Sequence, residues 1–219
     1  KGRLFLLTPN RNKIKIPISW YFLRAMDKKT KILDSAQSLM LEKGFVAATI
    51  EDICQKAGVT KGSFFYYFKD KEELGKNVAL HFACGQEQMI AEKCRPQDES
   101  DPLKRIFNLL DLIYEASNNP ENKGCLIGIF SQELSETHPN IRKVCEETFN
   151  KFIDKIKNDF FLAKEKYAPK GSFEPEELAE YFLATIQGSL ILMRAKKDNK
   201  VVQRSVKQYR EYVKILFGR

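Results

Sequence analysis

The chain has 219 residues, a length that fits one or two domains. Its 43% hydrophobic and 30% charged residues are typical of a folded globular protein and exclude a disordered chain. The formal net charge is +8, but six basic residues and no acid lie in residues 1–25, which leaves 31 basic against 29 acidic residues elsewhere. A nucleic-acid partner therefore has to be argued from local patterns.

Residues 1–25 differ from the rest of the chain, because two prolines interrupt them and they contain no acid. Their apolar run is too short for a signal peptide. Since Met26 is the first methionine, we interpret residues 1–25 as a non-native or disordered N-terminal extension. The alternative is a basic arm that contacts DNA phosphates.

From Thr30 onward the apolar residues recur at helical spacing. The first helix is expected to end at Gly44, and a second, short helix opens at Thr49 with a capping-box pattern. A third helix is expected over residues 60–68 and a fourth over about 70–93. The polar residues 95–101 interrupt the pattern.

Five further helices are expected, with a proline in the first turn of three of them and a loop at residues 118–124. Their approximate ranges are 102–117, 125–136, 139–167, 174–197 and 200–217. No stretch alternates with a period of two, so the sequence predicts an all-α protein of about nine helices. No apolar run reaches the ~18–20 residues of a membrane-spanning helix.

The second and third helices form a predicted helix-turn-helix over residues 49–68. Gly58 can adopt the left-handed conformation of the turn, and the small Cys54 lets the two helices approach closely. The predicted seam between them consists of Ile50, Ile53, Ala57, Val59, Phe64 and Phe68. Polar, basic and aromatic residues remain on the outward side of the third helix, which fits a DNA-recognition helix and equally a helical hairpin with a solvated lysine face.

Residues 57–74 read AGVTKGSFFYYFKDKEEL, and the segment from about Thr30 to Leu74 resembles the DNA-binding domain of the TetR family of bacterial transcriptional regulators. Two positions depart from the family pattern. Phe65 stands where tyrosine is usual, which would remove one hydroxyl contact to phosphate. Cys54 replaces a common alanine, a change that we interpret as an adjustment of packing.

The resemblance implies a three-helix DNA-binding domain (residues 26–75), joined by a linking helix to a C-terminal domain that binds an effector and dimerises (residues 76–219). It also implies that Lys61, Gly62 and Ser63 face base edges in the major groove. The phosphate contacts would come from Thr49, Thr60, Tyr66, Tyr67 and Lys71, next to Phe65.

Two apolar stripes on the last two helices predict a homodimer interface, because family members are dimers. The alternative is that the stripes belong to the core of one chain. The predicted interface residues are Phe182, Ile186, Gly188, Ser189, Val202, Val206, Tyr209, Val213 and Leu216.

The middle helices are rich in aromatic residues and predict an apolar pocket for a small-molecule effector, although most such residues serve the core. The candidate pocket residues are Phe107, Tyr114, Cys125, Ile129, Phe149 and Phe152. Residues 124–128 resemble a branch of the family in which Cys125 could line the ligand site or sense electrophiles and oxidants, but a structural role is favoured.

The odd count of five cysteines, without C-x-x-C spacing, is not typical of a disulfide framework or a zinc ribbon and indicates the reduced cytoplasm. His81 and Cys84 are one helical turn apart, but two ligands do not make a zinc site. We expect no metal and no cofactor.

We therefore predict a cytoplasmic, dimeric repressor that binds double-stranded operator DNA and is released by an unknown small-molecule effector. The sequence contains no nucleophile elbow and no phosphate-binding glycine loop, so we do not expect an enzyme. The remaining alternatives are a regulator that senses electrophiles through Cys125, and a helical small-molecule-binding protein without a DNA function. We expect no membrane contact.

Overall fold

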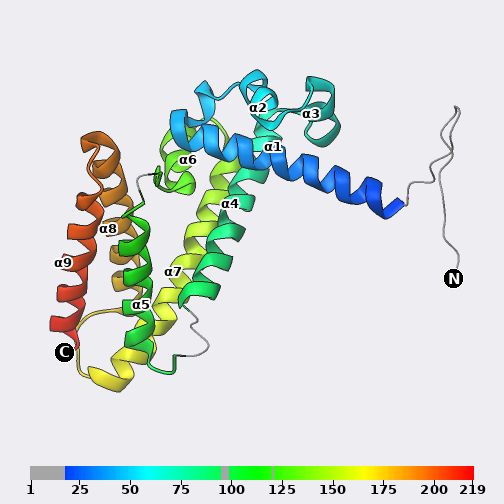
Figure 1. Ribbon diagram of the computed structural model, residues 1–219. Helices are drawn as coiled ribbons and strands as arrows, with labels where there is room; N and C mark the ends of the chain where they lie inside the picture. The colour runs from blue at the N-terminus through cyan, green and yellow to red at the C-terminus, as the bar shows by residue number, and fades with distance from the viewer. Residues whose placement is uncertain (1–17, 95–98, 120) are drawn as a thin grey trace, which may run out of the picture. The chain divides into compact units, whose positions relative to one another are not determined.

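The structure is a computed structural model that describes the backbone of residues 18–94, 99–119 and 121–219, and side chains from Lys28 onward within those ranges. The described residues form helices and no strands, which confirms the all-α prediction. Figure 1 shows these helices: α1 (Ile18–Ala47), α2 (Ile50–Ala57), α3 (Lys61–Tyr67), α4 (Lys71–Cys94), α5 (Pro102–Ala116), α6 (Leu126–Leu134), α7 (Pro139–Tyr167), α8 (Pro175–Lys196) and α9 (Lys200–Leu216).

The first helix differs most from its predicted bounds. It begins at Ile18 rather than at Thr30, so the prolines of the N-terminal segment do not keep residues 18–25 out of the helix. Gly44 has φ 84° and ψ 172°, so the regular helix is interrupted there, as predicted. The segment that we interpreted as an extension lies outside the described residues as far as residue 17, and its non-native origin stays a prediction.

The chain divides into two compact units, of which the first ends at Val78 and the second begins at Ala79. In the first unit α1 packs against α2, and α2 packs against α3. Their apolar faces exclude water almost completely, which supplies the main stabilisation of so small a unit. The buried side chains include Ile32, Ala36, Met40, Ile53, Phe64, Phe68, Leu74 and Val78.

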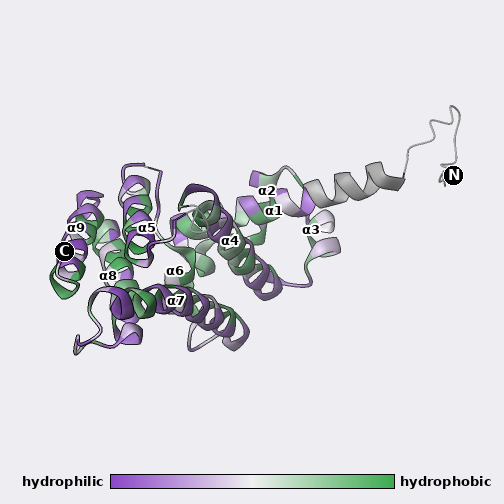
Figure 2. Cartoon of the chain, turned by 90° about the horizontal axis from the view of Figure 1, so that it is seen from below, coloured by the Kyte–Doolittle hydropathy of each residue, from purple (hydrophilic) through white to green (hydrophobic). Residues whose placement is uncertain are grey.

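The second unit is a helical bundle in which α7 contacts α5, α6 and α8, and α9 contacts α5 and α8. Its helices are amphipathic, with hydrophobic and hydrophilic residues on different sides (Figure 2). The buried Tyr209 in α9 donates a hydrogen bond of 2.8 Å to the carbonyl of Leu178 in α8. That bond satisfies a hydroxyl inside the core, where an unpaired polar group would be costly.

The short helix α6 lies close to α8. A Cβ atom at Gly128 would overlap the side-chain oxygen of Gln187, so a larger residue there would require the Gln187 side chain to move. Arg194 of α8 also donates a 3.0 Å hydrogen bond to the carbonyl of Lys123 in the loop before α6. Within the described part of the chain, no helix is long and apolar enough to cross a membrane.

Candidate nucleic-acid interface

Side chains of two threonines begin the two short helices of the first unit. The Thr49 hydroxyl accepts a 3.1 Å hydrogen bond from the Asp52 amide, while the Asp52 carboxylate accepts a 3.3 Å bond from the Thr49 amide, which completes a capping box. The Thr60 hydroxyl accepts a 3.1 Å bond from the amide of Ser63. Each hydroxyl keeps its own hydrogen, which can be donated to a DNA phosphate.

The turn between α2 and α3 depends on Gly58, which has φ 65° and ψ 36°. In this left-handed conformation its amide donates back to α2, and the Val59 amide donates a 3.0 Å bond to the Cys54 carbonyl. Burial raises the pKa of the Cys54 thiol. This cysteine is therefore part of the packing, as the sequence indicated.

The helix α3 has a buried side and an outward side. Phe64 and Phe68 are fully buried, whereas Phe65 and Tyr66 are 53% and 79% exposed. Three residues of the predicted seam, Ile50, Ala57 and Val59, are only half-buried, because α2 and α3 are short and the seam reaches the surface. Among the predicted DNA-reading residues, Lys61 and Gly62 are exposed and Ser63 is half-buried, and Tyr67 is half-buried against Tyr66.

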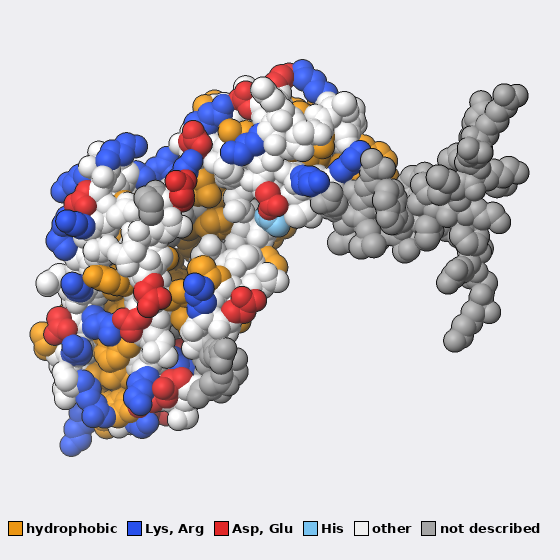
Figure 3. Space-filling view, in the orientation of Figure 1, with side chains coloured by type: hydrophobic (Ala, Val, Ile, Leu, Met, Phe, Trp, Pro, Cys, Tyr) orange, Lys and Arg blue, Asp and Glu red, His pale blue; other side chains and the backbone are white. Residues whose placement is uncertain are grey.

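Several lysines of the first unit lie beside acids or polar atoms of the same unit, and Figure 3 shows basic and acidic side chains close together there. Lys61 forms an ion pair with Glu51 of α2. Lys71 donates a 3.0 Å hydrogen bond to the carbonyl of Val46 and lies 4.7 Å from the ring centre of Phe45. The phosphate contact expected of Lys71 stays a prediction, since its ammonium also has this structural role.

Taken together, the first unit presents a short, exposed helix that carries ammonium, hydroxyl and aromatic groups and is supported by a buried apolar back. Ammonium and hydroxyl groups are the donors that proteins use for phosphates and base edges. Among the residues that the structure describes, no group of three or more possible metal ligands occurs. The fold and this face together define a helix-turn-helix DNA-binding protein.

Comparisons with known proteins agree with that class. The family model described as bacterial regulatory proteins, tetR family, matches residues 32–78. A model of the LmrA/YxaF-like transcriptional regulator C-terminal domain matches residues 102–208. An uncharacterised HTH-type transcriptional regulator from the lacX 3′ region of Lactococcus lactis is 31% identical over 180 residues, which are 80% of this chain and 87% of that protein.

The chain belongs to the TetR family of bacterial regulatory proteins, and it is a DNA-binding transcriptional regulator. The HTH-type transcriptional repressor DhaR of a Mycobacterium species is 26% identical over 170 residues, 77% of this chain and 83% of the repressor. A TetR transcriptional regulator from Chloroflexus aurantiacus has the same fold, with a TM-score of 0.78, 18% identity, and coverage of 87% of this chain and 96% of that one.

The predicted dimer residues lie mostly inside the second unit. Seven of the nine are buried within a single chain, because the stripe that they form faces α5 and α7 rather than outward. Their burial within one chain favours the core alternative for these seven, and their part in a dimer interface stays a prediction. They are Phe182, Ile186, Ser189, Val202, Val206, Tyr209 and Val213. Leu216 is half-buried against the same core, and a Cβ atom at Gly188 would meet only open space.

The six predicted pocket residues are all half-buried, and one of them, Phe152, lines one of the two cavities described for the second unit. Phe107 and Tyr114 lie against Arg210 and Lys207 of α9 through cation–π contacts of 5.2 and 5.4 Å. The ring centres of Phe152 and Phe182 are 6.0 Å apart. Phe152 also lines a cavity of about 20 Å³, which has room for one water molecule. Phe149, Cys125 and Ile129 line neither of the two cavities described for the second unit, and Cys125 precedes α6 at the N-cap.

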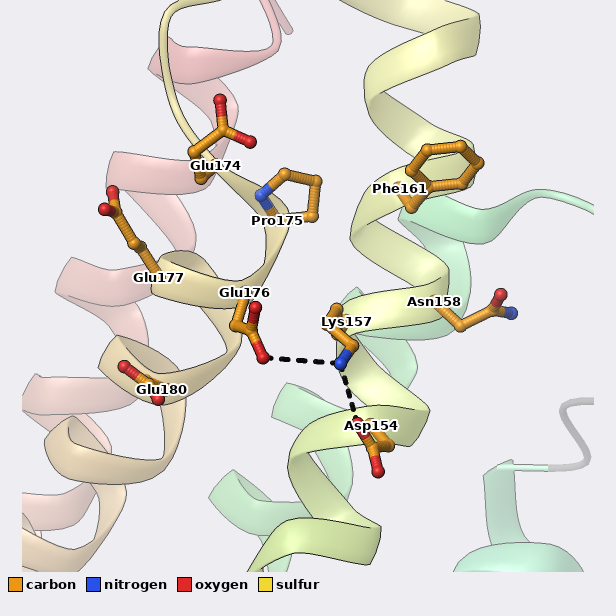
Figure 4. A pocket seen from close by; sticks show the side chains of 9 residues that line it. All are labelled: Asp154, Lys157, Asn158, Phe161, Glu174, Pro175, Glu176, Glu177 and Glu180. Carbon is orange, nitrogen blue, oxygen red and sulfur yellow. Dashed lines mark hydrogen bonds and ion pairs between the residues drawn. The ribbon is translucent and has the colours of Figure 1, made fainter.

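An open groove of about 770 Å³ lies between α7 and the start of α8 in the second unit. Figure 4 shows that Lys157 lies between Asp154 and Glu176, at 2.8 and 3.4 Å from their carboxylate oxygens. Glu174, Glu177 and Glu180 also line the groove. The groove is thus acidic and open, unlike the enclosed apolar pocket that the sequence indicated.

Two groups of residues were missed by the sequence reasoning. The first is Glu51, whose carboxylate reaches Lys61 across the turn; its proximity to α3 follows from the close packing of the two helices. The second is the outward side of the last two helices, which we call the outer face: Tyr181, Ala184, Gly188 and Leu192 of α8 with Tyr212 and Ile215 of α9, of which only Gly188 was among the predicted interface residues. The three- and four-residue spacing of the outer face indicates an apolar helix side. The dimer interface was instead assigned to the more strongly apolar stripe beside it.

Proposed function

We propose that the chain is a repressor that binds an inverted-repeat operator as a homodimer in the bacterial cytoplasm and leaves it when a small-molecule effector binds. The observation that carries the proposal is the outer face, which is apolar and exposed beside a stripe of α8 and α9 that is buried. The repressor DhaR is named for this activity, and its match to most of this chain supports the same role here.

The outer face has the properties of a self-complementary surface. Tyr181, Leu192, Tyr212 and Ile215 are 52%, 47%, 40% and 79% exposed, and the rings of Tyr181 and Tyr212 touch with centres 5.6 Å apart. Exposed apolar area of this kind is a cost in water and a gain in an interface. A Cβ atom at Gly188 would meet only open space, so the helix of a second copy could approach closely there.

A two-fold dimer explains how a short recognition helix can be specific. A single α3 reads only a few base pairs, whereas two copies read two half-sites about one helical turn, ~34 Å, apart. The operator would then be an inverted repeat, because its symmetry has to match the two-fold axis of the protein. Exposed Lys61 and Tyr66 would reach the DNA in each half-site.

An effector releases such a repressor by binding one conformation better than the other. The match to a regulator C-terminal domain over residues 102–208 supports an effector site in the second unit. The water-sized cavity beside Phe152 is the candidate, since Ile90, Leu109 and Ile156 add apolar walls to it. A ligand would have to enlarge it by moving these side chains.

The test starts with selection of binding sequences from a random DNA pool by the full chain. Fluorescence anisotropy then compares the selected duplex with a scrambled one over a salt series, and sedimentation gives the stoichiometry. We expect an inverted repeat, two chains per duplex and a preference of at least ~10³ over scrambled DNA. Recovery of a single half-site bound by one chain would contradict the dimer. An effector screen that includes apolar small molecules then measures release from the selected duplex.

A further inference from the structure

Two neighbouring acids in the first turn of α2 have different partners. The Asp52 carboxylate closes the capping box with Thr49. It also forms an ion pair with Lys43 of α1, whose ammonium nitrogen lies 2.6 Å from a carboxylate oxygen. The Glu51 carboxylate reaches the other way, to the ammonium of Lys61 at the start of α3. The capping and the tie to α1 are thus done by Asp52, and Glu51 is left with a partner on the outward helix.

The Glu51–Lys61 pair lies at the surface, with side chains that are 60% and 57% exposed. A hydrogen bond from the Lys61 ammonium lowers the pKa of the Glu51 carboxyl, so the acid is ionised at neutral pH. Exposed ion pairs are weak, because water competes for both partners. This pair can therefore open at low cost when a better partner for Lys61 arrives.

The pair changes what DNA meets at the first turn of α3. Without Glu51, the Lys61 ammonium would be a free positive charge that any phosphate could attract, whatever the base sequence. With Glu51 in place, a phosphate has to displace the Glu51 carboxylate from Lys61 and is also repelled by it. The net gain in binding free energy is therefore small. A guanine edge offers two acceptors, O6 and N7, to the lysine without bringing a full negative charge close to the carboxylate.

We propose that Glu51 is a specificity-determining residue of the DNA interface, which withholds Lys61 from phosphates of unrelated DNA and releases it to a base edge of the operator. Glu51 acts through Lys61 and is a positioning residue. Breaking the Glu51–Lys61 pair costs free energy on every duplex. Only the operator offsets this cost, because it offers Lys61 the two acceptors of a correctly placed guanine. The result is a lower affinity for random DNA at little expense to operator binding.

The experiment compares the full chain with Glu51→Gln, which keeps the shape and removes the charge. Glu87→Gln is the matched control, since Glu87 is exposed on α4 and its loss changes the net charge equally. Lys61→Gln and the Glu51→Gln/Lys61→Gln double variant complete a cycle. Each protein is titrated by anisotropy against random duplex and against the duplex selected by the wild-type chain, over a salt series, and thermal unfolding is recorded in parallel.

We expect Glu51→Gln to raise the affinity for random DNA by about fivefold, to change operator affinity less, and to steepen the salt dependence on random DNA by about one counterion. In the Lys61→Gln background the same substitution should leave the ratio of the two affinities unchanged. A binding-site selection with Glu51→Gln should return a less defined sequence at the position that Lys61 reads.

Three results would overturn the proposal. Equal changes on random and operator DNA, matching those of Glu87→Gln, would mean that only net charge matters. An effect of Glu51→Gln that persists without Lys61 would mean that the acid acts directly. A lower unfolding temperature with an unchanged affinity ratio would leave Glu51 as a stabilising residue of α2 only.

Discussion

The ammonium of Lys71, the first residue of α4, donates a 3.0 Å hydrogen bond to the backbone carbonyl of Val46 near the end of α1. Val46 follows the interruption of the helix at Gly44, and the ammonium gives its carbonyl a charged hydrogen-bond donor. The same ammonium lies over the Phe45 ring. Lys71 thus fastens α4 to α1 within the first unit, in addition to any contact with DNA.

Replacing Lys71 with methionine should therefore destabilise the first unit. We expect the free energy of unfolding to fall by about 1 kcal/mol, because one hydrogen bond and one cation–π contact are lost. Urea unfolding, monitored by circular dichroism, measures this change. The control is Lys69→Met, because Lys69 is exposed two residues earlier, in the turn before α4. If Lys71→Met left stability unchanged but weakened binding to all DNA equally, the lysine would serve phosphates alone.

Gly62 should be needed for DNA rather than for the fold. A Cβ atom at this position would meet only the Thr60 hydroxyl, at 3.9 Å, so alanine fits the free protein. Gly62→Ala is expected to stabilise α3 by up to about 1 kcal/mol through helix propensity, while its methyl group obstructs approach to base edges and lowers operator affinity.

Gly58→Ala should affect the fold, in contrast to Gly62→Ala, which should affect DNA binding. Because φ is +65° at Gly58, alanine there should destabilise the fold by about 1 kcal/mol. Unfolding curves and operator titrations on both variants separate the two roles. Unchanged operator affinity in Gly62→Ala would remove Gly62 from the interface.

The outer face and the buried stripe should respond differently to substitution. Leu192→Glu places a charge on the exposed face and should give monomers in sedimentation, with the helix content retained. Val206→Ala removes two methyl groups from the core and should cost about 1–3 kcal/mol of stability without changing the oligomeric state. A dimeric Leu192→Glu protein would contradict the assignment of the outer face.

The cysteines should differ widely in reactivity. Burial raises the pKa of the Cys145 thiol to about 11, although a hydrogen bond with Ser131 partly opposes this. Only about one Cys145 in a thousand is then a thiolate at pH 8. Cys84 is exposed on α4 and should react first with iodoacetamide, as peptide mass spectrometry can establish. Fast labelling of Cys145 in folded protein would show that its site opens, and labelling of Cys125 that abolishes DNA binding would support electrophile sensing.

Asp101 should make stability depend on pH in the acid range. Burial opposes its ionisation, but hydrogen bonds from Tyr167, from Lys166 and from the first amides of α5 outweigh it and hold the pKa at about 2. Because this pKa is lower in the folded chain than in the unfolded one, the stabilisation is complete above about pH 4 and is lost as the pH falls toward 2.

Tyr167→Phe should return the Asp101 pKa toward its ordinary value and flatten the loss of stability between pH 4 and 2. Urea unfolding at several pH values measures the slope. Lys157→Gln is the control, since it also removes a partner of carboxylates but lies away from Asp101, in the groove of Figure 4. An unchanged slope in Tyr167→Phe would mean that the backbone amides alone hold the carboxylate.

Local backbone chemistry explains which parts of the fold could be predicted from the sequence. Thr49, Gly58 and Thr60 place the caps and the turn, and each is a signal carried by a single residue and its neighbours. The helix bounds after residue 49 agree with their predicted ranges to within a few residues, because glycine, proline and capping residues stand at most ends. The start of α1 follows Pro17, a signal that the prediction did not use, so the prediction there was wrong.

Contacts between helices were harder to predict. The stripe from Val202 to Val213 was read correctly as apolar, but periodicity does not say whether it faces a helix of the same chain or of another. Likewise, the half-buried Phe107 and Tyr114 were assigned to a pocket, and only the packing of α9 beside α5 shows that cationic side chains cover them. Contacts between side chains of different helices depend on how each helix is rotated about its own axis. The spacing of apolar residues defines that rotation only approximately.

The helix α4 belongs to both units, since the boundary between Val78 and Ala79 falls inside it. A truncated protein meant to carry only the DNA-binding unit therefore cannot end in a loop. Stopping after Val78 would leave the last four carbonyls of a broken helix without partners, next to a terminal carboxylate whose charge the helix dipole disfavours. Ending the fragment at Gly85 would place a glycine, a residue suited to a helix end, last, and would move the open carbonyls and the carboxylate seven residues away from the first unit.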